Sequence, residues 1–207
     1  MAGLLGISRV IDGFNERIGK ITAWAILVAV LVSAINAIIR KLFGTSSNAW
    51  LELQWYLFGA VFMLCASWTL KANEHIRIDI ISSRLSQRGR NIMEMVGHFL
   101  FLLPFVALMI YLSWPFFIRS AASGEVSTNA GGLLIWPAKG LILLGFILLG
   151  FQWLSEVIKR VAIMRGELDD EHATGGHGAS AEAEAQRLIA ELNDPDSKGE
   201  MPGDSMR

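Results

Sequence analysis

Hydrophobic residues are concentrated in four long runs that contain no Asp, Glu, Lys or Arg. These runs cover residues 21–39, 53–70, 95–118 and 140–155. A bilayer core about 30 Å thick is crossed by roughly 20 helical residues, and the first three runs reach or nearly reach that length. The fourth reaches it when the helix begins near Leu133 and includes Lys139, whose long side chain can extend to the interface.

Helices and closed barrels are the structures that satisfy all of their backbone hydrogen bonds inside a bilayer, and these runs have the length of helices. The sequence therefore predicts an all-α integral membrane protein. We expect four transmembrane helices, with spans at about 21–41, 51–71, 94–118 and 134–158. Pro104 lies inside the third run, where we expect it to kink the helix.

The residues before the first run have the spacing of an amphipathic helix. Apolar side chains recur there at steps of three and four, at Leu4, Ile7, Ile11, Phe14 and Ile18. This spacing places them on one helical face, so we predict an N-terminal amphipathic helix over residues 1–19. Such a helix can lie along the cytoplasmic membrane surface or pack against a partner, and the sequence favours the surface position.

Charge divides the chain near Gly166. Residues 1–166 carry 15 Lys and Arg against 8 Asp and Glu, whereas residues 167–207 carry 3 against 11. We therefore expect a transmembrane domain over residues 20–166, followed by an acidic and largely disordered tail over residues 167–207.

Charge also predicts the orientation, because short cytoplasmic loops are enriched in Lys and Arg. The N-terminus, the loop between spans two and three and the segment after span four carry 11 basic residues, and the other two loops carry 4. Both termini and the acidic tail are therefore predicted to be cytoplasmic. The loops at 40–52 and 119–139 should lie outside, beside the interfacial Trp50, Trp114 and Trp136.

The spans offer little chemistry of their own. Catalytic or transport sites in membranes need ionisable residues deep in the helices, and these runs contain only His98. We expect Asn36 and Gln152 to bridge helices by hydrogen bonds. The sequence predicts no enzyme activity, no metal, no cofactor and no nucleic-acid partner. One alternative stays open: a membrane anchor of a redox complex, with haem held by His98 and His75.

Two segments of the chain resemble a known family, the small membrane (DctQ-type) subunits of tripartite ATP-independent periplasmic (TRAP) transporters. The resemblance covers about residues 10–165. The first segment runs from the second span into the next loop, and the second is GEVSTNAGGLLIWPAKG at residues 124–140. Trp55 departs from the family pattern, in which a basic residue is common. The matching features of the first segment are Trp50, Glu52-Leu53, the small residues over 59–67, Lys71 and His75-Ile76-Arg77-Ile78-Asp79.

The resemblance implies a role in transport across the bacterial inner membrane. Such a subunit would support a large membrane subunit and help to dock a periplasmic substrate-binding protein during sodium-coupled uptake of an organic acid, a carboxylate. We expect the docking residues to be Trp50, Glu52, Glu125, Asn129 and Trp136. Anionic lipids should contact the cytoplasmic residues Arg77, Arg84, Arg88 and Arg90. A free-standing four-helix assembly protein is the remaining alternative.

Overall fold

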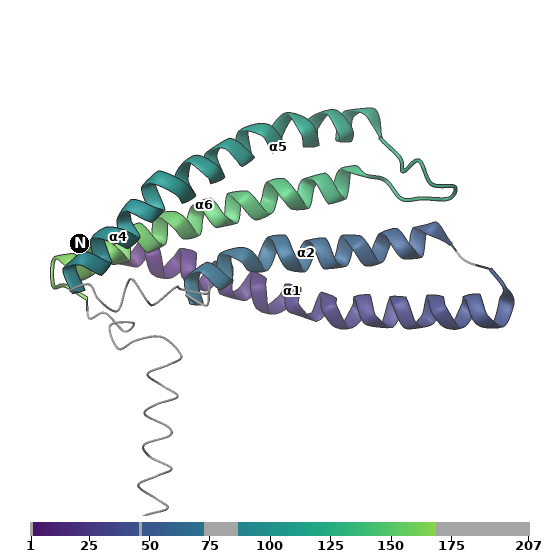
Figure 1. Cartoon of the computed structure of the whole chain (residues 1–207), viewed down its shortest axis with the longest axis horizontal. Coiled ribbons are helices and arrows are strands. Elements are labelled where there is room, and N and C mark those ends of the chain that lie inside the picture. Colours follow the sequence, from purple (N-terminus) through teal and green to yellow (C-terminus); the bar gives the residue numbers. More distant parts are fainter. Residues whose placement is uncertain (1, 46, 73–86, 169–207) are drawn as a thin grey trace, which may run out of the picture.

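The chain folds into long helices joined by short connections (Figure 1). The computed structural model describes residues 2–45, 47–72 and 87–168. Four helical stretches within these ranges are long and apolar enough to cross a membrane, which confirms the predicted architecture. The helices are α1 (Ala2–Phe43), α2 (Asn48–Ala72), α4 (Gln87–Gly97), the π-helical turn η1 (His98–Leu102), α5 (Leu103–Ser123) and α6 (Trp136–Met164).

Helix α6 is the centre of the molecule. It packs against α1, α2 and α5, whereas α5 packs mainly against α6 and forms one edge of the array (Figure 1). Small residues and a few aliphatic ones fill the contacts, among them Ala29, Leu148 and Ala162. Large apolar side chains such as Phe62 and Tyr111 are exposed, as expected of a body that lipid or another membrane subunit surrounds.

Helices α2 and α6 approach each other closely at Gly145. A Cβ atom at this position would lie 2.8 Å from both the Cβ and the backbone oxygen of Met63. Because a backbone atom cannot move aside as a flexible side chain can, the two helices are this close only with glycine at position 145.

The Gly145→Ala variant should therefore be less stable by about 1–3 kcal/mol, the usual cost of inserting a methyl group into a tight contact. Gly150→Ala is the matched control, since its Cβ would lie 3.4 Å from a side-chain methyl group of Val106, an ordinary contact. Thermal unfolding of the two purified variants would compare them. Equal unfolding temperatures would contradict the close approach at Gly145.

The N-terminal segment is helical, as predicted, but it is continuous with the first span. α1 runs from Ala2 to Phe43 without a break at the expected boundary near residue 19. Ser8 and Asn15 are buried against α6, while Val10 and Phe14 on the other side of the helix are exposed. The polar face of this segment therefore packs inside the protein, and its apolar face points outward.

The third span contains a π-helical turn next to Pro104, where we predicted a kink. The amide of Leu103 bonds to the carbonyl oxygen of His98, five residues earlier, and Pro104 follows in the first turn of α5. The Nε1 of Trp153 on α6 also donates to the His98 carbonyl, at 2.9 Å. The extra residue of the π turn thus takes up the irregularity that a proline introduces into a helix.

Candidate functional site: a hairpin loop on a buried glutamate

The connection between α5 and α6 is an ordered hairpin, which we call the hairpin loop (residues 124–135). Gly124 ends α5 with a positive φ of 61°. An antiparallel bridge then joins Val126 to Leu134, and the amide of Ser127 donates to the oxygen of Leu133 at 2.9 Å. The hairpin loop lies at the same end of the molecule as the turn between α1 and α2 (Figure 1). We call this end the hairpin end.

Glu52 of α2 lies beneath the hairpin loop and is 4% exposed. One carboxylate oxygen accepts hydrogen bonds from the Ser127 hydroxyl and from Asn129 Nδ2, the latter at 2.8 Å. The other oxygen accepts one from the amide of Leu133 at 2.6 Å. Glu52 therefore holds both strands of the loop and its turn, and its own charge is hydrogen-bonded on both oxygens.

Two further side chains of α2 hold the same loop. Asn48 Nδ2 donates to the oxygen of Ala130 at 2.9 Å, and the Tyr56 hydroxyl donates to the oxygen of Leu134 at 2.8 Å. Asn48, Glu52 and Tyr56 are spaced at four-residue intervals, so they share one face of α2. This spacing was visible in the sequence, but the partner of that face was not.

Gly132 is required where the loop crosses Glu52. A Cβ there would lie 2.5 Å from the Cβ of Ser127 and 2.9 Å from Oε1 of Glu52. Gly131 beside it has a positive φ of 70°, which favours glycine for conformational reasons. The Gly-Gly pair thus lets the loop close tightly over the carboxylate, while residues 128–131 at its tip are exposed.

An ion pair anchors the base of the hairpin loop. Lys139 Nζ pairs with Glu125 and lies 4.1 Å from the centre of the Phe116 ring, and the Ser120 hydroxyl donates to the same carboxylate at 2.6 Å. The hydrogen bonds from Lys139 and then from Ser120 lower the pKa of Glu125. A lowered pKa means that this anchor is fully formed at neutral pH and weakens only under acidic conditions.

The five predicted docking residues all lie at the hairpin end, with different exposures. Trp50 and Trp136 are 40% and 39% exposed, and Asn129 is exposed although its amide reaches Glu52. Glu125 is half-buried in the pair with Lys139. Glu52 is covered by the loop, so it can act on a partner only through the loop that it positions.

The structure places only two of the four arginines that were predicted to contact lipid. Arg77 and Arg84 lie outside the described residues, as does the acidic tail beyond residue 168. Arg88 and Arg90 lie in the first turn of α4, at the end of the molecule opposite the hairpin loop (Figure 1).

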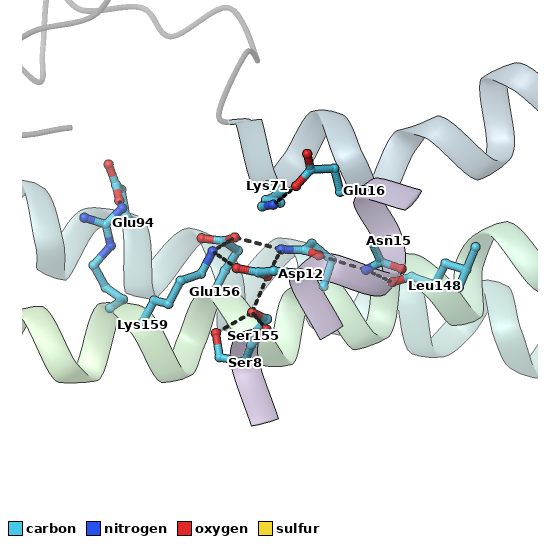
Figure 2. Close-up of polar contacts among 12 residues, drawn as sticks. Ser8, Asp12, Asn15, Glu16, Lys71, Glu94, Leu148, Ser155, Glu156 and Lys159 are labelled. Atoms are coloured by element: carbon cyan, nitrogen blue, oxygen red, sulfur yellow. Dashed lines mark hydrogen bonds and ion pairs between the residues drawn. The ribbon is translucent and has the colours of Figure 1, made fainter. Parts of the chain in front are cut away.

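A second polar cluster joins the N-terminal part of α1 to α6 (Figure 2). Asp12 accepts hydrogen bonds from Gln152 Nε2 at 2.8 Å and from the Ser155 hydroxyl at 2.6 Å, and it pairs with Lys159 at 3.1 Å. Gln152 Oε1 in turn accepts a hydrogen bond from Asn15 Nδ2 at 2.8 Å. We call this cluster the α1–α6 network; it consists of Ser8, Asp12, Asn15, Gln152, Ser155, Glu156 and Lys159.

The α1–α6 network confirms that Gln152 bridges helices, but most of its members were not predicted. Asn36, the other residue expected to bridge, is buried at 8% exposure. The signal that we missed was the regular spacing of Ser8, Asp12 and Asn15, which places three polar side chains on one side of α1. The sequence favoured a position of this segment on the membrane surface, whereas these polar side chains pack against α6.

His98, the candidate haem ligand, lies in the π-helical turn. Its Nδ1 is 2.8 Å from the carbonyl oxygen of Glu94, and its Nε2 is buried without a hydrogen-bond partner among the described residues. The proposed second ligand, His75, lies outside those residues. Across the ranges that the structure describes, no group of three or more His, Cys, Asp or Glu residues could hold a metal ion.

Comparison with known proteins identifies the family. No curated protein sequence matches the chain. The family model of the tripartite ATP-independent periplasmic transporters, DctQ component, matches residues 23–162. This match spans the second and third transmembrane helices, the hairpin loop with Glu52 beneath it, the second half of α1 and most of α6. The chain therefore belongs to the DctQ family and is the small membrane subunit of a TRAP transporter.

Proposed function

We propose that this subunit supports the large membrane subunit of its transporter and helps to dock a periplasmic substrate-binding protein. The complex would carry out sodium-coupled uptake of an organic acid, a carboxylate. The observation that carries the docking proposal is the hairpin loop held on the buried Glu52, because it presents an exposed tip on a fixed base.

A fixed loop suits a docking surface for an energetic reason. Binding loses affinity when it must order a flexible segment, so a loop that is already held in place avoids that cost. Seven hydrogen bonds support the loop here: three to Glu52, two to Asn48 and Tyr56, and two between its own strands. The proposed docking residues at this end are Trp50, Glu125, Asn129 and Trp136, with Glu52 as the residue that positions the loop.

The proposed orientation follows from the same assignment. The hairpin end would face the periplasm, and both termini would lie in the cytoplasm of a cell with this subunit in its inner membrane. The excess of basic residues in the segments at the N-terminal end supports this orientation. Arg77, Arg84, Arg88 and Arg90 would then contact anionic lipids of the cytoplasmic leaflet.

The supporting role is consistent with the exposed surface of the helices. Large apolar side chains line the outside of α1 and α5, and a partner subunit can pack on such a surface as well as lipid can. Purification of the tagged chain from native membranes in mild detergent tests this role. A large multi-span protein should accompany it, and its repeated absence would contradict the proposed supporting role.

The docking role predicts a specific effect of Thr128→Lys. Thr128 is exposed at the tip of the hairpin loop, so a long charged side chain fits there without disturbing the hydrogen bonds to Glu52. We expect weaker binding of the periplasmic protein by about tenfold, with unchanged abundance in the membrane, because the side chain would separate the two surfaces. Thr128→Ser is the matched control. Unchanged affinity of the Thr128→Lys variant in a vesicle-binding assay would disprove docking on this tip.

A further inference from the structure

An open groove of about 520 Å³ lies at the hairpin end, between the last turns of α5 and the start of α6. One part of its wall is apolar and is formed by Leu112, Pro115 and Phe116. The other part is polar and carries two cations, Arg119 and Lys139, with Glu125 as the one acidic residue in the lining.

The charges in the groove do not balance. Lys139 is paired with Glu125 and is only 13% exposed. The guanidinium of Arg119 is exposed, and within the described part of the chain it has no hydrogen-bond or ion-pair partner. The groove therefore carries one uncompensated positive charge, with a second cation beside it.

The apolar and cationic residues follow one another along α5, and they meet where Lys139 Nζ lies 4.1 Å from the centre of the Phe116 ring. Leu112 precedes Arg119 by seven residues, which is about 10 Å along a helix. Trp114 and Trp136 belong to the two helices that form the groove and are 57% and 39% exposed, and exposed tryptophan is typical of the edge of the hydrocarbon region. Arg119 lies five residues beyond Trp114, about 7.5 Å further along α5 toward the hairpin end, which is the headgroup side of that tryptophan in the proposed orientation.

From this arrangement we infer that the groove binds an anionic phospholipid. The phosphate and the charged headgroup would contact Arg119 and Lys139, and an acyl chain would lie along Leu112, Pro115 and Phe116. Guanidinium groups bind phosphate through paired N–H donors, and an exposed apolar wall below them accommodates an acyl chain. In the orientation proposed above, this lipid belongs to the periplasmic leaflet.

The test uses the full-length chain, purified together with any subunit that accompanies it, in a phosphate-free neutral detergent. Binding of short-chain phosphatidylglycerol is measured by native mass spectrometry and compared with phosphatidylcholine of the same acyl length. We expect the anionic lipid to bind more tightly. The Arg119→Gln variant should bind phosphatidylglycerol about fivefold more weakly, which is the typical contribution of one basic residue at a membrane surface. Its affinity for phosphatidylcholine should not change.

Two further variants serve as controls. Arg40→Gln removes an exposed positive charge at the same end of the molecule but outside the groove, and it should have no effect. Arg119→Lys keeps the charge and should retain most of the binding. Equal affinities for the two lipids, or equal effects of Arg119→Gln and Arg40→Gln, would overturn the inference.

Two outcomes would assign the groove to another occupant. Displacement of the lipid by millimolar inorganic phosphate alone would show that the groove recognises a free anion, and the phospholipid assignment would then be wrong. Loss of lipid binding in preparations that contain a large multi-span partner would show that protein covers the groove, and this also overturns the inference. Neither of these lipid-binding measurements depends on transport activity. The lipid inference and the proposed transport function can therefore fail independently of each other.

Discussion

Replacing Glu52 with Gln should release the hairpin loop. In the Glu52→Gln variant, amide hydrogen exchange at residues 126–135 should accelerate by about tenfold or more, since hydrogen bonds to a charged acceptor are the strong ones in this loop. Because the hairpin loop is then less ordered, binding of the periplasmic protein should also weaken. Hydrogen exchange followed by mass spectrometry measures the first effect directly and needs no knowledge of the transported substrate.

The expected effect follows from the number of acceptors. The carboxylate offers only acceptor sites, and its three partners are all donors: the Ser127 hydroxyl, the Asn129 amide and the backbone N–H of Leu133. Glutamine has the same shape but places an NH₂ group against at least one of these donors. The variant thus keeps the volume of the side chain and removes both the charge and an acceptor.

The control for this experiment is Glu167→Gln, the same substitution at an exposed position beyond α6. It should leave exchange in the hairpin loop unchanged. Unchanged exchange in Glu52→Gln as well would show that Glu52 does not hold the loop. Slower docking with an intact loop would instead mean that Glu52 contacts the partner directly, as the sequence alone had led us to expect.

The sequence predicted the membrane architecture well because it depends on local properties. Runs of apolar residues determine where helices cross a bilayer, and three of the four expected spans lie within the long helical stretches. The fourth was expected at about 134–158, whereas α6 begins at Trp136, after the hairpin loop. The position of Pro104 also predicted a local feature, a helix irregularity, which is present as a π-helical turn. Lys139, whose side chain was expected to extend to the interface, is instead 13% exposed and paired with Glu125.

The roles of the polar residues could not be predicted in the same way, because they depend on which helices are neighbours. Glu52 was expected to help dock a partner, but residues about 80 positions later fold over it. The N-terminal segment was expected to lie on the membrane surface, but α6 brings Gln152 and Lys159 to its Asp12. The apolar pattern identifies the helices, whereas these long-range contacts come from their packing.

The second large effect is expected at Gln152, which is fully buried in the α1–α6 network. Its Nε2 donates to Asp12 at 2.8 Å and to Glu156 at 2.9 Å. The Gln152→Glu side chain has the same shape but replaces this donor by a third carboxylate. Lys159 already pairs with the two carboxylates of Asp12 and Glu156. We expect a loss of about 3–5 kcal/mol in the free energy of unfolding, the usual cost of an uncompensated buried charge.

Gln152→Met separates the effect of charge from that of the hydrogen bonds. Methionine fills a similar volume without polar atoms, and interhelical hydrogen bonds in membranes contribute about 0.6 kcal/mol each on average. It should therefore destabilise the protein by about 1–2 kcal/mol, clearly less than glutamate does. Unfolding temperature in detergent and abundance in the membrane should both follow the order wild type, Gln152→Met, Gln152→Glu.

Adding Asp12→Asn to Gln152→Glu should restore part of the lost stability. This second change removes one carboxylate and supplies an amide donor opposite residue 152. In the double variant residue 12 would donate to residue 152, whereas in the wild type Gln152 donates to Asp12. Asp12→Asn alone should destabilise the protein, because it replaces the partner of Lys159 by a neutral group. Recovery in the double variant would show that positions 12 and 152 are coupled within one network. Additive losses would show that α1 and α6 are not joined through this pair.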